Sequence, residues 1–326
     1  MQTWLSHHAL TAFRIIFGWT YFSAFWRRLI LENKLNPEAG NYLGIKFNAF
    51  WPNALLIKDS IRWFLENPEA LYLQLFAFTI IEAIVGLLLI LGLFTRLAAF
   101  GASLLALGIL LGAGWLGTTC LDEWQIGILG IAGGLAILYQ GGGAVALDRL
   151  QSIQNSPIGK INKRVAALLY AGGKRLWLVF TLLAVVIALG TNQYFHGGLW
   201  GKLHNPSKRP AYSIEHVRIE NEHLRFRFAR TGGIDTYGSF ILYVNLLSPQ
   251  EKQLKQLRIE DFSSEDFSIK NRLIAKISTG KYALEVPLGA EADIEYTLPP
   301  ALQQQTIGSV ELVDVSGRKW QAEVAP

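Results

Sequence analysis

The segment LQLFAFTIIEAIVGLLLILGLFTRLAAF, Leu73 to Phe100, gives the strongest indication of fold class in this 326-residue chain. Its first part, Leu73 to Phe94, is almost wholly apolar, and an α-helix needs about 20 such residues to cross a hydrocarbon core. The segment FTRL, Phe94–Leu97, leaves room only for a tight turn before a second apolar run begins. Because short connections join antiparallel neighbours, the stretch predicts two adjacent transmembrane helices.

The composition of the whole chain is also that of a membrane protein. Hydrophobic residues make up 51% of the sequence, charged residues only 17%, and the mean hydropathy is +0.27. The net charge of +5 is modest and gives no reason to expect nucleic acid as a partner. One cysteine excludes an internal disulfide, and the six histidines lack HxxH or HExxH spacing, so we expect no metal site.

Five segments are apolar and long enough to be membrane spans, and the first four predict a compact bundle. The N-terminal segment lacks the basic region and cleavage site of a signal peptide, so we expect it to be retained. Repeated glycines in the third and fourth segments would let helices approach closely. The five segments cover about 9–31, 73–94, 97–116, 124–140 and 176–193, and the glycines are Gly101, Gly108, Gly112, Gly127, Gly130, Gly133 and Gly134.

Beyond about residue 205 the hydrophobic period changes to that of β-strands. HLRFRF, GSFILYVNL, KYALEVPL and GSVELVDV alternate or run apolar, with turn sequences such as TGG and STG between them. We therefore expect a membrane all-α fold, a four-helix transmembrane bundle over 1–145 followed by a basic linker at 146–175. A fifth transmembrane helix, about 176–193, then carries a C-terminal all-β sandwich, about 205–326.

The distribution of basic residues predicts the orientation in a prokaryotic cell membrane. The connection 141–175 is the most basic, and the positive-inside rule places it in the cytoplasm. The TTCLDEW connection and the β domain are then extracytoplasmic. The connection 31–72 opposes this orientation, because it would lie outside although it carries Lys34, Lys46, Lys58 and Arg62. Within it, Ala54–Leu65 predicts an amphipathic helix that lies in the membrane interface or packs on the end of the bundle.

The connection TTCLDEWQIG, Thr118–Gly127, holds the only cysteine of the chain. A lone cysteine is often a small buried hydrophobe, and Trp124 fits an interfacial anchor. Cys120, however, lies at a helix boundary beside Asp122 and Glu123. The two carboxylates would raise its pKa, whereas the N-terminus of the next helix would favour the thiolate. Cys120 is therefore a candidate nucleophile as well as a candidate core residue.

Other polar residues interrupt apolar segments or gather in one loop. Arg14 and Glu82 lie within the first two helices, where a charge costs at least a few kcal/mol unless it is paired or faces a polar cavity. They are therefore an ion pair or part of a pocket for a polar headgroup, and Arg96 is expected to be a cytoplasmic anchor. In RTGGIDTYG, Arg230–Gly238, Asp235 can bond the amides of a glycine turn. This loop is structural, or it is a site loop with Arg230 binding an anion.

Several of these motifs resemble known families. Arg14, Glu82 and the LGLFTR turn ending at Arg96 resemble the DoxX-like four-helix membrane family. NYLGIKFN, Asn41–Asn48, and TTCLDEWQIG resemble DoxD, a subunit of thiosulfate:quinone oxidoreductase. WGKLHNPSKRP, Trp200–Pro210, and RTGGIDTYGSF resemble DoxA, the partner subunit. The chain thus looks like a DoxD–DoxA fusion over nearly its whole length.

The resemblance implies oxidation of thiosulfate to tetrathionate, with electrons passed to a membrane quinone. A reactive group at the membrane boundary suits this chemistry, because thiosulfate is an aqueous dianion and a quinone arrives through the lipid bilayer. We expect Cys120 to form an adduct with thiosulfate. Candidate residues for the remaining roles are Asp122 and Glu123 as proton relays, Lys46, Arg230, Asp235 and Tyr237 for binding thiosulfate, and Arg14, Glu82, Trp124 and Gln125 for the quinone or its proton path.

The sequence leaves other functions open. The bundle could be a non-catalytic scaffold with a partner-binding β domain, since fold does not determine activity. It could also be a quinone-linked enzyme for another small sulfur anion. No flavin or haem motif is present in the sequence, which is consistent with direct transfer to the quinone. A homo-oligomer is compatible with the sequence.

Overall fold

The computed structural model describes residues 2–114, 123–204, 209–233 and 239–325. The chain folds as two compact units that interleave along the sequence. The first unit consists of Met1–Leu43, Glu69–Leu111 and Asp122–His204. The second consists of Gly44–Pro68, Gly112–Leu121 and Asn205–Pro326.

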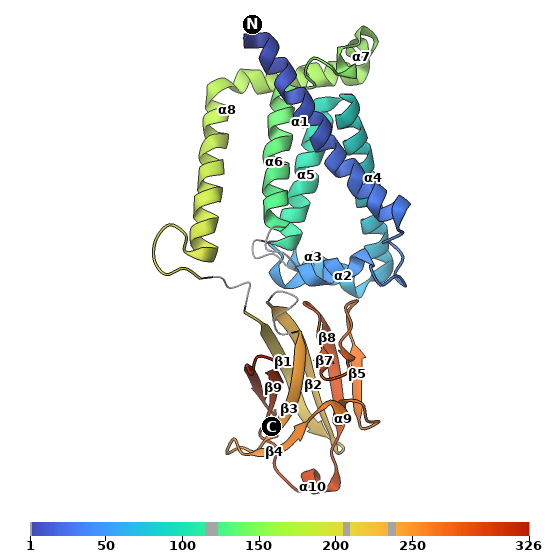
Figure 1. Ribbon diagram of the computed structural model, residues 1–326, viewed down its shortest axis with the longest axis vertical. Helices are drawn as coiled ribbons and strands as arrows, with labels where there is room; N and C mark the ends of the chain where they lie inside the picture. Colours follow the sequence, from blue (N-terminus) through green and yellow to red (C-terminus); the bar gives the residue numbers. More distant parts are fainter. Residues whose placement is uncertain (1, 115–122, 205–208, 234–238, 326) are drawn as a thin grey trace. The chain divides into compact units, whose positions relative to one another are not determined.

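The first unit is helical and contains three helices that are long and apolar enough to cross a membrane. These stretches are Pro68–Leu91, Thr95–Ala113 and Leu178–His196, among the residues that the structure describes, and Trp124–Gln140 is apolar but shorter. The predicted helical N-terminal region is thus confirmed, with three candidate membrane spans in the part of the chain that the structure describes. The elements are α1 (Gln2–Phe25), the π-helix η1 (Trp26–Leu31), α4 (Pro68–Leu91), α5 (Thr95–Ala113), α6 (Glu123–Gln140), the 3-10 helix η3 (Leu147–Arg149), α7 (Gln151–Asn155) and α8 (Pro157–His196) (Figure 1).

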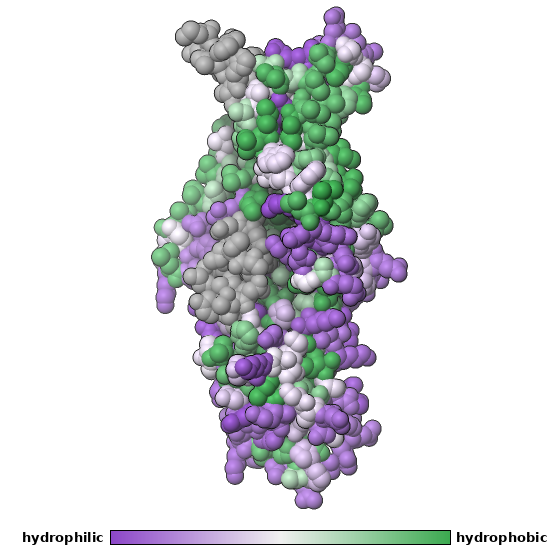
Figure 2. Space-filling view, turned by 45° about the vertical axis from the view of Figure 1, so that its right-hand side comes forward, coloured by the Kyte–Doolittle hydropathy of each residue, from purple (hydrophilic) through white to green (hydrophobic). Residues whose placement is uncertain are grey.

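Large apolar side chains cover the outside of these helices. Ile16 on α1, Leu73 on α4, Leu129 on α6 and Val186 on α8 are each at least 65% exposed. Figure 2 shows hydrophobic residues over the helical unit, on the face that it presents. Because an aqueous protein rarely exposes so continuous an apolar surface, this surface fits contact with lipid.

Small residues let the helices of the first unit pack closely, as the glycine pattern predicts. A Cβ atom on Gly86 of α4 would lie 2.7 Å from the carbonyl oxygen of Gly18 on α1. A Cβ atom on Gly127 of α6 would lie 2.9 Å from Cβ of Leu110 on α5. Tyr21 of α1 also donates a hydrogen bond from its hydroxyl to the carbonyl oxygen of Ala102 on α5, at 3.0 Å. Close backbone approach is therefore a property of this helix packing.

The segment expected to be a basic linker is largely helical. Ser156 caps α8 by accepting a hydrogen bond from the amide of Gly159 at 3.0 Å. The helix is broken at Gly173, where φ is 46° and ψ is −141°, and it ends at Gly197 in the left-handed conformation. Figure 1 shows the two arms of α8 on either side of this break, and the second arm contains the apolar stretch Leu178–His196.

The second unit contains an all-β domain of two antiparallel sheets, as the period-two pattern predicts. One sheet has the order β1-β2-β8-β5, and the other has the order β10-β9-β3-β7-β6, with β4 paired to β3. Alternate residues of β2 point into the core, where Leu224, Phe226 and Phe228 are buried. The strands are β1 (Ala211–Glu220), β2 (His223–Gly232), β3 (Phe240–Leu247), β4 (Gln253–Leu257), β5 (Phe267–Asn271), β6 (Ser278–Thr279), β7 (Leu284–Glu285), β8 (Glu291–Thr297), β9 (Ser309–Asp314) and β10 (Lys319–Glu323), with short helices α9 (Ile259–Phe262) and α10 (Pro300–Gln303).

The connection between α1 and α4 supplies the remaining helices, α2 (Leu43–Phe50), the 3-10 helix η2 (Trp51–Asn53) and α3 (Lys58–Glu66). The sequence predicts one helix over 54–65 and does not predict α2. The helix begins only at Lys58, because Leu56 has a φ of 59°, which a right-handed helix does not allow. Ile61 and Leu65, on the apolar face of α3, are buried in protein. We call residues Leu43–Glu66 the α2–α3 platform.

Candidate functional site

The residues expected to carry the sulfur chemistry fall mostly outside the described ranges. These are Cys120, Asp122, Asp235, Tyr237 and the side chain of Glu123. The described residues that flank the two signature segments do have defined neighbours. The site can therefore be built from Gly112–Gly114, which precede the TTCLDEW segment, and from Arg230 and Ser239, which lie on either side of the GGIDTYG segment.

Gly112 and Gly114 pack on the α2–α3 platform. A Cβ atom on Gly112 would contact the ring of Phe50 at 3.5 Å and Ile61 at 4.0 Å. Gly114 has a φ of 70°, and a Cβ atom there would overlap the carbonyl group of Asn53. Any larger residue at Gly114 would thus be strained and would clash. Gly112 and Gly114, among the last described residues before the TTCLDEW segment, are thus in contact with the platform.

Asn48 of α2 joins the platform to the β domain. Its side-chain amide donates a hydrogen bond to the carbonyl oxygen of Gly289 at 2.5 Å. Its side-chain oxygen accepts one from the backbone amide of Ala275 at 3.1 Å. The side chain is fully buried, so both contacts are made away from water, where an unmade hydrogen bond costs about 1–3 kcal/mol.

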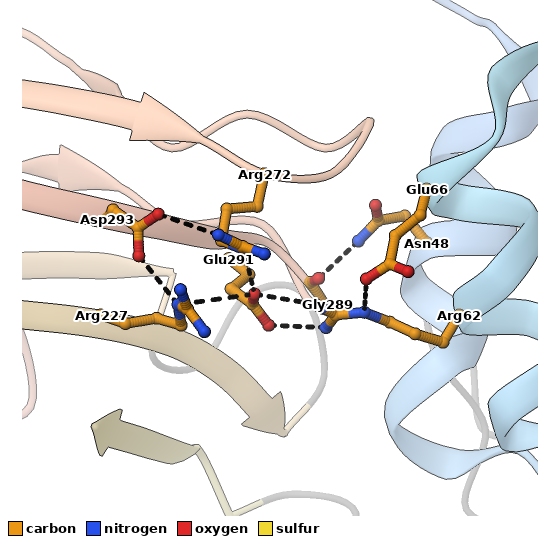
Figure 3. A network of polar contacts seen from close by, with 8 residues as sticks. All are labelled: Asn48, Arg62, Glu66, Arg227, Arg272, Gly289, Glu291 and Asp293. Atoms are coloured by element: carbon orange, nitrogen blue, oxygen red, sulfur yellow. Dashed lines mark hydrogen bonds and ion pairs between the residues drawn. The ribbon is translucent and has the colours of Figure 1, made fainter. Parts of the chain in front are cut away.

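Arg62 of α3 forms the second junction (Figure 3). Its guanidinium donates two parallel hydrogen bonds to the buried carboxylate of Glu291, at 2.7 and 2.9 Å. The hydrogen bond to Glu291 raises the pKa of Arg62 further above its ordinary value, despite partial burial. Arg62 also bonds Glu66 at 2.6 Å and lies over the ring of Trp51. This bidentate geometry fixes the direction of α3 against β8.

Arg230 closes the base of the GGIDTYG loop. Its guanidinium donates to the hydroxyl of Ser239 at 2.7 Å and to the carbonyl oxygen of Val286 at 2.9 Å. Its backbone carbonyl accepts from the amide of Gly289 at 3.0 Å, and its amide donates to Ala290 at 3.0 Å. The side chain is fully buried. These contacts hold the two ends of the loop together beside Gly289, the same residue that Asn48 binds.

The platform thus brings the described flanks of both signature segments to one place. Gly114 lies against Asn53, and Gly289, which is bonded to Arg230, lies against Asn48. Lys46 is exposed and lies on the same helix as Asn48, two residues before it. The sequence missed Asn48 and Arg62 as junction residues, although NYLGIKFN ends at Asn48 and Arg62 stands out in the apolar segment IRWFL. The arrangement holds the described ends of the two signature segments against one element, with the charged side chain of Lys46 exposed on the same helix as Asn48.

A separate polar pair lies in the first unit. Glu82 of α4 is 2% exposed and forms an ion pair with Arg28 of η1. A direct Arg14–Glu82 pair, one of the two interpretations of the sequence, is wrong. Arg14 instead donates to the carbonyl oxygens of Leu89, Ile90 and Val145. The reason is position, because Leu89 lies seven residues beyond Glu82, about 10 Å along the helix.

Three further residues singled out in the sequence, Arg96, Trp124 and Gln125, lie in the first turns of α5 and α6. Arg96, expected as a surface anchor, is buried and donates to the carbonyl oxygens of Leu138 and Tyr139 at the end of α6. Trp124 and Gln125 lie in the first turn of α6, and Gln125 is exposed. Within the described ranges, no group of three or more His, Cys, Asp or Glu side chains could hold a metal ion.

Both parts of the chain match known protein families. Residues 10–171 match the family described as TQO small subunit DoxD, and residues 195–323 match the family described as TQO small subunit DoxA. No solved structure matches the chain. The α2–α3 platform belongs to the first match and the β domain to the second. The chain therefore belongs to the DoxD and DoxA families of thiosulfate:quinone oxidoreductase small subunits, which it joins in a single polypeptide.

Proposed function

We propose that this chain is a membrane-bound thiosulfate:quinone oxidoreductase that oxidises thiosulfate to tetrathionate. The observation that carries the proposal is the presence of both small-subunit families in one chain, in the order DoxD then DoxA. In this proposal α1, α4, α5 and α6 form a four-helix transmembrane bundle and the second arm of α8 is a fifth span. The β domain and Cys120 face the extracytoplasmic side.

The sulfur chemistry is assigned to Cys120. The Cys120 thiolate and one thiosulfate lose two electrons to the quinone and form a Cys–S–S–SO₃⁻ adduct. A second thiosulfate attacks the central sulfur of this adduct, which releases tetrathionate and regenerates the thiolate. Two electrons and two protons convert the quinone to the quinol. Asp122 and Glu123 act as proton relays beside the thiol.

Thiosulfate binding is assigned to the neighbourhood of the platform. The support is that Gly114 and Arg230, which flank the two signature segments, both have neighbours on or beside the platform. Lys46 supplies an exposed positive charge there. Asp235 and Tyr237 belong to the loop whose base Arg230 closes, so we propose that Arg230 shapes the binding loop from within the fold.

Quinone reduction is assigned to the helical unit, at the ion pair of Arg28 and Glu82. Glu82 is the one carboxylate within the apolar part of α4, and such a residue is a functional candidate by default. We propose that Glu82 holds a proton for the quinone and that Arg28 positions its carboxylate. Trp124 and Gln125 line the approach from α6, and Arg14 supports the region by bonding the end of α4.

The test is quinone reduction by the purified full-length chain in detergent or liposomes. Thiosulfate should support reduction of a soluble quinone analogue, with one tetrathionate formed for each quinol. Sulfite, given in place of thiosulfate, distinguishes a different sulfur substrate. Well-folded protein that reduces the quinone with neither donor would refute the enzyme and favour a non-catalytic scaffold.

A further inference from the structure

We infer that the α2–α3 platform is the surface by which the DoxD part of this chain recognises the DoxA part, and that this contact holds the β domain without the help of the covalent link. The platform lies within residues 10–171, and the β domain lies within 195–323. Their contacts are therefore contacts between two subunit families. The inference rests on these contacts and not on the proposed activity.

The first part of this surface is the contact between Asn48 and the backbone of the β domain. Asn48 bonds one carbonyl group and one amide of the β domain, from Gly289 and Ala275, and both bonds are buried. Gly289 has a φ of 77°, and a Cβ atom there would overlap the carbonyl group of Asn48. Only glycine thus allows this approach. Such a contact specifies a single docking geometry, since it depends on shape as well as on hydrogen bonds.

The second part is a buried charge that the platform completes. Glu291 is largely buried on β8 and is bonded by Arg272 of its own domain at 3.0 Å, while Arg227 lies 4.0 Å away. Arg62 adds two hydrogen bonds from the platform. Removing Arg62 would leave this carboxylate partly unpaired in a buried position, which is strongly unfavourable. Glu291 of the β domain is therefore an acceptor for an arginine that lies outside that domain.

The covalent link makes contacts of a different kind. Between α8 and β1, the amides of Leu199 and Trp200 are bonded by the side chain of Gln193, and the amide of His204 donates to the carbonyl oxygen of His196. The partners in these hydrogen bonds, Gln193 and His196, belong to the last turn of α8. Trp200 and Leu203 are exposed. The described part of the link next to α8, residues 197–204, is thus bonded locally, whereas Asn48 and Arg62 contact the β domain directly.

The test cuts this link in the folded protein. A protease site is inserted after Gly201, which is exposed and has open space around it. After cleavage in membrane vesicles, the fragment from 202 to 326 should stay in the membrane pellet, because the platform remains attached to α1 and α4. The Asn48→Ala, Arg62→Ala double variant, cleaved in the same way, should release the fragment to the supernatant.

The matched control is Arg225→Ala. Arg225 lies on the same sheet and pairs with Glu220 and Glu295, but these partners belong to the β domain itself. This variant should retain the fragment as the unsubstituted chain does. Circular dichroism of any released fragment establishes that it is still a folded β domain. Release of the fragment from the unsubstituted chain, or its full retention by the double variant, would overturn the inference.

Discussion

Arg28 and Glu82 form an ion pair inside the helical unit, between the π-helical end of α1 and the middle of α4. Glu82 is almost fully buried, and a carboxylate at that depth is tolerated when a cation neutralises it. Arg28 lies in the π-helix η1, and π-helical turns are rare and often occur at functional sites. The pair stabilises the fold and, in the proposed function, places a titratable group within the apolar part of the protein.

Replacing Arg28 by alanine should destabilise the helical unit. The substitution leaves the buried carboxylate of Glu82 without its partner, a change that costs about 3–5 kcal/mol in comparable buried pairs. Thermal unfolding of the detergent-purified protein should show a lower midpoint. Arg27→Ala is the matched control, because Arg27 is the exposed neighbour and its guanidinium donates a hydrogen bond to the carbonyl oxygen of Ser23, not to the carboxylate of Glu82. Equal midpoints for the two variants would show that the pair contributes nothing.

Glu82→Gln should separate the chemical role from the structural one. Glutamine keeps the shape and can still accept a hydrogen bond from Arg28, so the protein should fold. It cannot hold an exchangeable proton as a carboxyl group does, so thiosulfate-dependent quinone reduction should fall by about 100-fold or more, the usual loss for an acid–base group. Normal turnover by well-folded Glu82→Gln would remove Glu82 from the proton path.

The parts of the fold that could be predicted from the sequence are those with a strong period. Leu73–Phe94 is almost wholly apolar and its residues up to Leu91 lie in α4, and HLRFRF alternates as β2 does, with Leu224, Phe226 and Phe228 buried. The alternation along β2 reports which side chains are buried, whereas the apolar run reports only that a helix is long enough to cross a membrane. The sequence also predicts the turn between these two apolar runs, although the structure places it at Gly92–Phe94 and begins α5 at Thr95, within the expected turn Phe94–Leu97.

The polar contacts of the site could not be predicted in this way. The partners of Arg14 are backbone carbonyl groups, which every residue carries and which leave no mark in the sequence. Arg28 faces Glu82 through a π-helix that no spacing rule signals. Asn48 and Gly289 are far apart in the chain, and their contact depends on how two elements meet. Local patterns determine elements, whereas these contacts depend on tertiary packing.

Arg14 should prove to be a structural residue. Its guanidinium donates hydrogen bonds to carbonyl groups at the end of α4 and to that of Val145, so Arg14→Met should lower the thermal midpoint by removing these hydrogen bonds. Quinone reduction per folded molecule should stay close to that of the unsubstituted protein. A well-folded Arg14→Met protein with a large loss of turnover would place Arg14 in the quinone site instead.

The stability of the β domain should depend on pH through Asp293. Burial alone would raise the pKa of Asp293, but hydrogen bonds and charge from Arg227 and Arg272 outweigh it and lower the pKa below its ordinary value. Ionised Asp293 therefore stabilises the fold above the unfolded-state pKa of about 4, and this stabilisation is lost as the pH falls through the lower folded-state pKa. The thermal unfolding midpoints of the unsubstituted and Asp293→Asn proteins should differ at pH 7. They should become equal at a pH below the folded-state pKa of Asp293. A gap that stays constant across this range would contradict the assignment.

Cys120→Ser should keep the fold and abolish thiosulfate oxidation. Serine differs by one atom, but its hydroxyl cannot form the sulfur–sulfur bond of the adduct. Protein incubated with thiosulfate and oxidised quinone should gain the mass of one thiosulfate on the Cys120 peptide, and a thiol reductant should remove it. Because the chain has no other cysteine, alkylation reports this residue alone, and thiosulfate should protect against it. Near-normal turnover by Cys120→Ser would rule out the covalent route. Thiosulfate would then be oxidised in a site of charged groups such as Lys46, without a bond to the protein.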